Sequence, residues 1–94
     1  MGPAPIRIIP PTEIDADTVQ VLMSELTSID AGSHVLIDCS EVTFMDSSGI
    51  RAIITESERQ STNGGWLRVD NPSAVVRRLL ELTDLTRFIS DPAL

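Results

Sequence analysis

Short apolar runs alternate with amphipathic segments along this chain, and the alternation limits the folds that it can adopt. Residues 6–9 (Ile-Arg-Ile-Ile), 35–37 (Val-Leu-Ile) and 66–69 (Trp-Leu-Arg-Val) have the composition of β-strands. Segments with helical periodicity separate them, and two strands joined through a helix need a crossover connection that makes them parallel. The sequence therefore predicts an α/β fold with a small mixed, mostly parallel sheet and helices packed on it.

We expect residues 35–37 at the centre of this sheet, because an uninterrupted apolar run is typical of a strand that is covered on both faces. Residues 6–9 are followed by Pro10 and Pro11. Proline cannot donate a backbone hydrogen bond to a neighbouring strand, and it restricts the residue before it. The first strand is therefore expected near an edge of the sheet.

The first predicted helix spans residues 18–29. Its apolar side chains recur at the spacing of one helix face: Val19, Leu22, Met23, Leu26 and Ile29. Asp15 or Asp17 is available as its N-cap, and Gly32 is the expected stop.

The second predicted helix begins at Ser47 or Ser48 and runs to about residue 61, where Asn63-Gly64-Gly65 ends it. The third predicted helix follows Asn71-Pro72. In this pair Asn71 is the expected cap, and the proline takes the first helical position.

Length and charge restrict the class of protein. A chain of 94 residues with 41% hydrophobic residues is long enough for one domain, so we expect a single domain over residues 1–94 with residues 1–5 flexible. No apolar run approaches the roughly 18 residues of a membrane span, and no signal peptide is recognisable. The formal charge of −7 opposes binding to nucleic acid or to an anionic membrane and favours a partner with a basic surface. The single cysteine, Cys39, is expected as a small buried side chain in a reducing compartment.

The segment from Phe44 to Ile50, Phe-Met-Asp-Ser-Ser-Gly-Ile, brings a carboxylate and two hydroxyls to the start of the second helix. Backbone N–H groups and the helix dipole favour negative charge there, so a phosphate on Ser47 or Ser48 would meet hydrogen-bond donors. Gly49 has no side chain and would let another chain come close to the hydroxyls. The simpler interpretation is that Asp46 or Ser47 is only an N-cap, and spacing alone favours it. A cap hydroxyl is held at the surface, so both interpretations can hold.

Enzymatic chemistry finds little support in the sequence. The Gly-x-Ser-x-Gly motif of serine hydrolases is missing, and the one histidine, His34, is expected about a strand length from the serines. Asp15 and Asp17 lack the neighbouring His or Cys residues that would favour a metal site, and no Gly-rich phosphate loop is present. We therefore expect no enzyme activity, no cofactor and no metal.

Several ordered motifs between residues 6 and 89 resemble the STAS domains, and among them the anti-sigma factor antagonists of bacterial partner-switching systems. The matching stretches are Glu13-Ile14-Asp15, Val35-Leu36-Ile37-Asp38, the segment from Val42 to Ile50, Asn71-Pro72-Ser73 and Leu79-Leu80-Glu81-Leu82. They cover the expected central strand, the loop that follows it and the last helix.

The resemblance implies a cytoplasmic switch that regulates transcription without being an enzyme. It implies that an anti-sigma factor serine kinase phosphorylates Ser47, that the unphosphorylated form binds this kinase and frees a sigma factor, and that a phosphatase resets the system. By the same analogy Asp15, Asp46, Ser48 and Gly49 form the partner-binding patch. The alternative is a constitutive binding module of the same fold in a transport or sensory complex, in which Ser47 is only a cap.

The N-terminus departs from the family pattern. The family usually has a further strand and hairpin before the segment that matches residues 6–9, and here this part is shortened. An edge strand left open in this way could pair in a homodimer, or Pro10 and Pro11 could shield it.

Overall fold

The computed structural model describes residues 4–90, and the chain forms two small parallel sheets with helices beside them. Residues 1–5 were expected to be flexible, and residues 1–3 of this segment lie outside the described residues. The elements in chain order are β1 (Ile6–Ile8), β2 (Glu13–Ile14), α1 (Val19–Thr27), β3 (His34–Asp38), β4 (Phe44–Met45), α2 (Ser47–Thr62), β5 (Trp66–Asp70), α3 (Ala74–Leu82) and the 3₁₀ helix η1 (Thr86–Phe88).

The larger sheet has the order β1-β3-β5, and both of its strand pairs are parallel. This confirms the predicted α/β class, the central position of β3 and the edge position of β1. The smaller sheet pairs β2 with β4, again in parallel. Neither of these two-residue strands was expected from the sequence.

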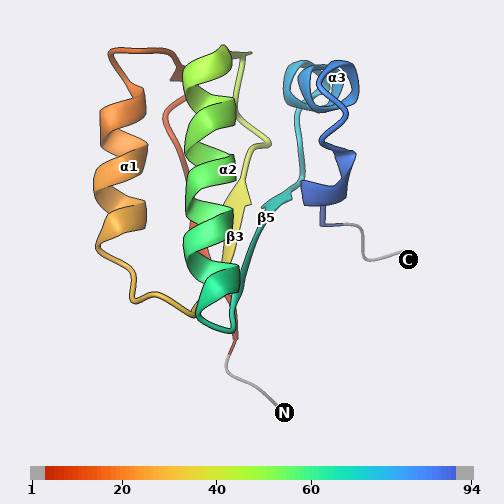
Figure 1. Ribbon diagram of the computed structural model, residues 1–94. Helices are drawn as coiled ribbons and strands as arrows, with labels where there is room; N and C mark the ends of the chain where they lie inside the picture. The colour runs from red at the N-terminus through yellow and green to blue at the C-terminus, as the bar shows by residue number, and fades with distance from the viewer. Residues whose placement is uncertain (1–3, 91–94) are drawn as a thin grey trace.

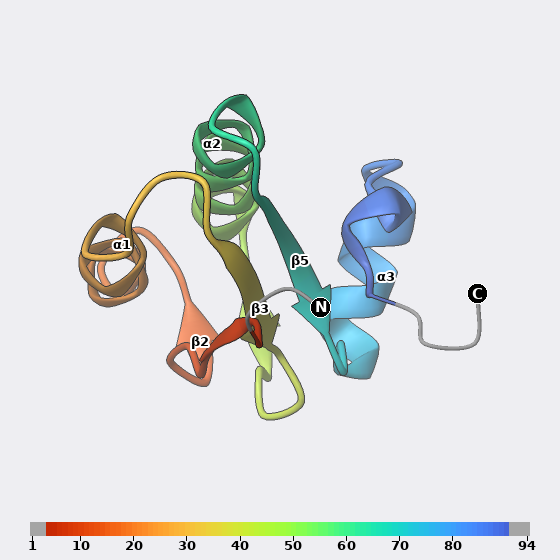
Figure 2. The same cartoon turned by 90° about the horizontal axis from the view of Figure 1, so that it is seen from below.

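The helices are distributed unevenly around the sheet. In Figure 1, α1 and α2 lie side by side with their N-termini at the same end, and α2 lies in front of β3, with β5 to its right. Figure 2 shows α3 beyond β5, on the side away from α1. Because both α1 and α2 follow strands of the smaller sheet, their first turns lie at one end of the molecule. None of the helices in the described residues is long and apolar enough to cross a membrane.

Residues of the larger sheet and of all three α-helices form one core cluster. Val35 and Ile37 of β3 and Val69 of β5 are fully buried there. Leu36, which points to the opposite face, is only partly buried, so the expected cover on both faces of β3 is wrong for that residue. On this second face Arg7 of β1 joins the ends of the neighbouring strands, with salt bridges of 3.2 Å to Asp38 and 2.6 Å to Asp70.

Two expected helix caps lie elsewhere. The N-cap of α1 is Thr18, which makes no side-chain capping hydrogen bond, while Asp15 caps the turn before it: its Oδ1 accepts from the N–H groups of Asp17 and Thr18 at 2.9 Å. The N-cap of α3 is Ser73, whose Oγ accepts from Val76 N at 3.3 Å. Asn71 instead takes a left-handed backbone conformation with φ of 47° in the turn after β5, a conformation that Asn tolerates better than most residues.

Helix α1 also ends earlier than expected. Its C-cap is Ser28, and Gly32 belongs to the loop before β3, where it has φ of +88°. A Cβ on Gly32 would meet the carbonyl oxygen of Asn63, so this glycine allows two loops to approach each other closely. By contrast, α2 runs from Ser47 to Thr62 and ends at Asn63, as the sequence predicted.

Candidate functional site

The smaller sheet brings two acidic residues from distant parts of the chain to one edge. Ile14 of β2 is paired with Met45 of β4, so the next residues, Asp15 and Asp46, leave the two parallel strands side by side. Asp46 N donates to the carbonyl of Ile14 at 3.1 Å and extends the pairing by one bond. The expected proximity of Asp15 to the start of α2 therefore follows from backbone pairing.

Asp46 is the N-cap of α2. Its Oδ1 accepts from Ser48 N at 2.8 Å, and its carbonyl oxygen accepts from Gly49 N at 3.1 Å and from Ile50 N at 3.4 Å. The sequence left Asp46 and Ser47 as alternative caps, and this geometry assigns the role to Asp46. It also changes one expectation: most N–H groups of the first turn already have partners, so a phosphate on Ser47 would find few free donors.

Ser47 is exposed at the first position of α2, and its hydroxyl makes no hydrogen bond to any of the described residues. Ser48 is partly buried and turns toward α1. Since Asp46 already caps the helix, the fold does not depend on a hydrogen bond from the Ser47 hydroxyl. This hydroxyl is free for an external partner or for modification.

Gly49 packs against the interior of the protein, and its expected contact with a partner stays a prediction. It is buried, and a Cβ at this position would lie 2.6 Å from Met45 Cγ and 3.0 Å from Ile14 Cγ2. The missing side chain lets the first turn of α2 rest directly on the β2–β4 pair. Gly49 thus sets the height of Ser47 and Ser48 above the smaller sheet.

Asp15 carries a fixed negative charge at this edge. The N–H groups of Thr18 and Asp17 donate to its carboxylate, and these hydrogen bonds lower the pKa of Asp15 below its ordinary value. Thr18 Oγ1 in turn donates to Glu13 O at 2.6 Å, which ties the turn to β2. Asp15 is therefore ionised at neutral pH and lies at the same edge as Asp46, the residue before Ser47.

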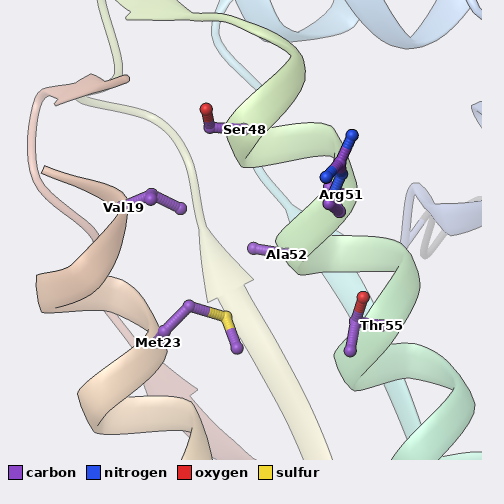
Figure 3. Close-up of a pocket in the computed structure, with 6 residues that line it drawn as sticks. All are labelled: Val19, Met23, Ser48, Arg51, Ala52 and Thr55. Carbon is purple, nitrogen blue, oxygen red and sulfur yellow. The ribbon is translucent and has the colours of Figure 1, made fainter. Parts of the chain in front are cut away.

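A groove of about 270 Å³ opens between α1 and α2 next to this edge (Figure 3). Its lining residues are Val19, Met23, Ser48, Arg51, Ala52 and Thr55. The sequence analysis did not anticipate it, because its shape depends on how the two helices pack. A possible signal was Ala52, a small residue on a helix face that otherwise carries Ile side chains.

Groups of interest for catalysis lie elsewhere. His34 stands at the opposite end of β3 from the loop that leads to Ser47, and its ring stacks on Trp66 with centroids 4.9 Å apart. Burial raises the pKa of the Cys39 thiol to about 12, so this side chain behaves as the small apolar residue that the sequence predicted. Within residues 4–90, no group of three or more His, Cys, Asp or Glu side chains is placed to hold a metal ion together.

Comparisons with known proteins agree on one family. The STAS domain family model matches residues 6–93. The anti-sigma-B factor antagonist of Bacillus subtilis (strain 168) is 30% identical over 78 residues, which are 82% of this chain and 72% of that protein. The structure of the anti-sigma factor antagonist SpoIIAA in its unphosphorylated form superposes with a TM-score of 0.71 at 20% sequence identity, over 90% of this chain and 75% of that one. The solved structure thus shares the fold.

Proposed function

The chain belongs to the STAS domain family, and from this premise we propose that it is an anti-sigma factor antagonist switched by phosphorylation of Ser47. The unphosphorylated protein binds an anti-sigma factor serine kinase, which releases a sigma factor. Phosphorylation ends this binding, and a phosphatase restores it. The proposal places the protein in the cytoplasm, where the kinase has access to ATP and to the transcription machinery.

The observation that carries the proposal is the division of roles between Asp46 and Ser47. Asp46 caps α2, whereas Ser47 is exposed and its hydroxyl has no partner among the described residues. A kinase can therefore modify Ser47 without breaking a hydrogen bond of the fold. This separation favours a switch over the interpretation of Ser47 as only a cap.

The charge of the site explains how phosphorylation would release the partner. A phosphoserine carries a charge of about −1.5 to −2 at neutral pH. The N–H groups of Ser48, Gly49 and Ile50 are already bonded to Asp46, so the phosphate gains little from the helix start. It lies instead beside Asp15 and Asp46, where it concentrates negative charge. Repulsion and the cost of desolvating this charge oppose docking against any partner surface that fits the unmodified edge.

The proposed partner surface comprises Asp15, Asp46, Ser47 and Ser48, with Gly49 supporting it from below. All four residues are exposed or partly exposed and come from the turn after β2 and the start of α2. The overall charge of −7 suits a basic patch on the anti-sigma factor.

Phosphate transfer tests the proposal directly. The wild type, Ser47→Ala and Ser48→Ala are incubated with ATP and each kinase-type anti-sigma factor of the source organism, and intact mass is measured. We expect one phosphate on the wild type and on Ser48→Ala, and none on Ser47→Ala. Equal modification of wild type and Ser47→Ala would refute the assignment to Ser47. If no kinase modifies the wild type, the constitutive binding module of a transport or sensory complex is the better interpretation.

A binding measurement supplements the mass measurement. Ser47→Glu places a charge at the switch position, and we expect it to bind the kinase at least tenfold more weakly than Ser47→Gln, its uncharged match in size. Both variants should unfold at nearly the same temperature as the wild type, because Ser47 is exposed. Equal affinities of the two variants would contradict the electrostatic mechanism.

A further inference from the structure

The groove between α1 and α2 extends from the proposed partner surface. In Figure 3, Val19 and Met23 of α1 point toward α2, while Ser48 and Ala52 of α2 point toward α1. Ala52 is only 4% exposed and forms part of the floor, and its small side chain leaves the space that Val19 and Met23 border. The lower part of the groove is thus apolar, and Ser48 belongs both to this groove and to the edge that carries Ser47.

The groove is held open by hydrogen bonds at both ends of α1. At the C-terminal end, Arg59 Nη2 of α2 donates to the carbonyls of Leu26 at 2.8 Å and Ile29 at 2.9 Å. At the N-terminal end, the turn at Asp15 and the β2–β4 pairing fix the start of α1 relative to α2. The helices therefore cannot close over the groove without breaking these bonds. A site formed in advance costs a partner less conformational entropy on binding.

Arg51 gives the groove a charge preference. Among the other described arginines, Arg7 and Arg59 form salt bridges, Arg68 and Arg87 lie over aromatic rings, and Arg77 and Arg78 lie on α3 and do not line the groove. Arg51 is exposed, lines the groove and has no salt bridge or side-chain hydrogen bond within residues 4–90. On a chain of charge −7, a free guanidinium beside an apolar floor selects a carboxylate next to an apolar group.

The volume limits the size of the occupant. Pockets for drug-sized ligands and cofactors usually measure about 300–1,000 Å³, and this groove of about 270 Å³ lies just below that range. It is large enough for one large apolar side chain or two small ones. A short protein segment fits this description better than a cofactor does.

We propose that the groove receives an apolar side chain of the anti-sigma factor while Arg51 binds a carboxylate beside it on the same partner. This inference rests on the proposed function, because it assigns part of the recognition to a second contact next to Ser47. The binding surface then has two regions of opposite charge. The acidic edge of Asp15 and Asp46 contacts basic groups of the partner, and Arg51 contacts an acidic group of the partner. The partner segment therefore needs basic, apolar and acidic side chains in one order along the surface.

The chemistry of the groove can be tested without the kinase. Hexanoate carries an apolar chain and a carboxylate, hexanol lacks the carboxylate, and acetate lacks the chain. We expect hexanoate to shift the amide NMR signals of Val19, Ser48, Arg51 and Ala52 in a saturable manner, and the other two probes to bind at least several-fold more weakly. Arg51→Glu should abolish the preference for hexanoate over hexanol, and Arg78→Glu should keep it. Arg78 is a matched control because it is exposed on α3, away from the groove.

Equal binding of hexanoate and hexanol by the wild type would overturn the role of Arg51. Absence of hexanoate shifts at the groove residues would overturn the site as a whole. Neither outcome bears on phosphorylation of Ser47, so the groove inference can fail while the proposed function stands.

The second arm uses the anti-sigma factor kinase that modifies the wild type in the mass measurement. We expect Arg51→Glu to weaken its binding about tenfold or more and Arg78→Glu to change it less than threefold, although both variants alter the net charge equally. Equal effects of the two variants would show that only overall charge matters and would overturn the inference. If no kinase modifies the wild type, the proposed function itself fails, and the NMR titration still decides whether the groove binds an apolar carboxylate.

Discussion

At the scale of single residues, neighbouring residues at the start of α2 have different roles. Asp46 satisfies the backbone of the first turn, Ser47 faces solvent, and Gly49 rests against Met45 and Ile14. The same short motif therefore contains one residue that holds the helix, one that is available to a partner and one that fixes the height of both. Each role predicts a different response to substitution.

Loss of the cap should be visible at Asp46 and not at Ser47. Asp46→Ala removes the acceptor of Ser48 N, so we expect the free energy of unfolding to fall by about 1 kcal/mol, within the usual range for a lost N-cap. Ser47→Ala should change it by less than about 0.5 kcal/mol, as is usual for exposed positions. Urea unfolding followed by Trp66 fluorescence measures both. A larger loss for Ser47→Ala than for Asp46→Ala would contradict the assignment of the cap.

Gly49→Ala should destabilise the protein although alanine favours helices. The new Cβ would meet Met45 Cγ at 2.6 Å, and such overpacking typically costs about 1–3 kcal/mol. The gain in helix propensity is below roughly 1 kcal/mol in a first turn, so a net loss is expected. In a Met45→Ala background the same substitution should cost less, because the Met45 atoms nearest to the new Cβ are gone and only Ile14 Cγ2 at 3.0 Å still crowds it. Equal costs in both backgrounds, measured by urea unfolding, would show that the contact is unimportant.

At the scale of elements, the sequence predicts the helices and strands that local residue patterns determine. The periodicity of residues 47–61 and the following glycines predict α2 almost to the residue, and the apolar run of residues 35–37 predicts β3. Strands β2 and β4 could not be found in this way, because each has two residues and exists only through its pairing with the other. Ser73 was overlooked as a cap because the local pattern Asn-Pro is equally good, and only the turn after β5 decides between them.

The candidate site was predictable in its residues but not in its arrangement. The resemblance to STAS domains implied Asp15, Asp46, Ser48 and Gly49 around Ser47, and the pairing of β2 with β4 explains why Asp15 lies near the start of α2. The inward orientation of Gly49 and the groove beside Arg51 depend on contacts between elements far apart in sequence. No local pattern contains such contacts.

Arg59 is the main polar link between α1 and α2, and its removal should be costly. Arg59→Met breaks its hydrogen bonds to Leu26 and Ile29 and leaves the 2%-exposed Glu56 without its partner at 2.9 Å. We expect a loss of roughly 3 kcal/mol in the free energy of unfolding. The double variant Glu56→Met, Arg59→Met should recover part of this loss, because no buried charge is then left unpaired. A double variant less stable than Arg59→Met would contradict this explanation.

At the scale of the whole molecule, ionised side chains join the ends of the larger sheet. Asp38 accepts from Ser40 N at 3.0 Å, and this hydrogen bond, together with the nearby Arg7 guanidinium, lowers the pKa of Asp38. Arg7 also reaches Asp70, so one residue of β1 links the carboxyl ends of β3 and β5. Protonation of Asp38 weakens the ion pair between β1 and β3.

The free energy of unfolding should therefore decrease as the pH falls into the acid range. Because the pKa of Asp38 is lower in the folded state, the unfolded chain binds more protons, and stability is lost as pH falls from the ordinary carboxyl value of about 4 through the lowered folded value. Asp38→Asn should make this loss shallower, whereas Glu58→Gln, an exposed match in charge, should not. Urea unfolding between about pH 2.5 and 7 tests this. Parallel curves for Asp38→Asn and the wild type would rule out Asp38 as a source of the acid sensitivity.

The pairing of β2 with β4 also affects how the protein would be recognised during its synthesis. This pairing joins segments that lie 31 residues apart, as the bond from Thr43 to Thr12 shows. Asp15 lies beside Asp46, and the groove exists, only when β2 has paired with β4 and α1 has packed beside α2. A kinase that reads all of these features would respond only to finished molecules. The number of antagonists that the cell senses would then equal the number that have folded, without any separate quality check.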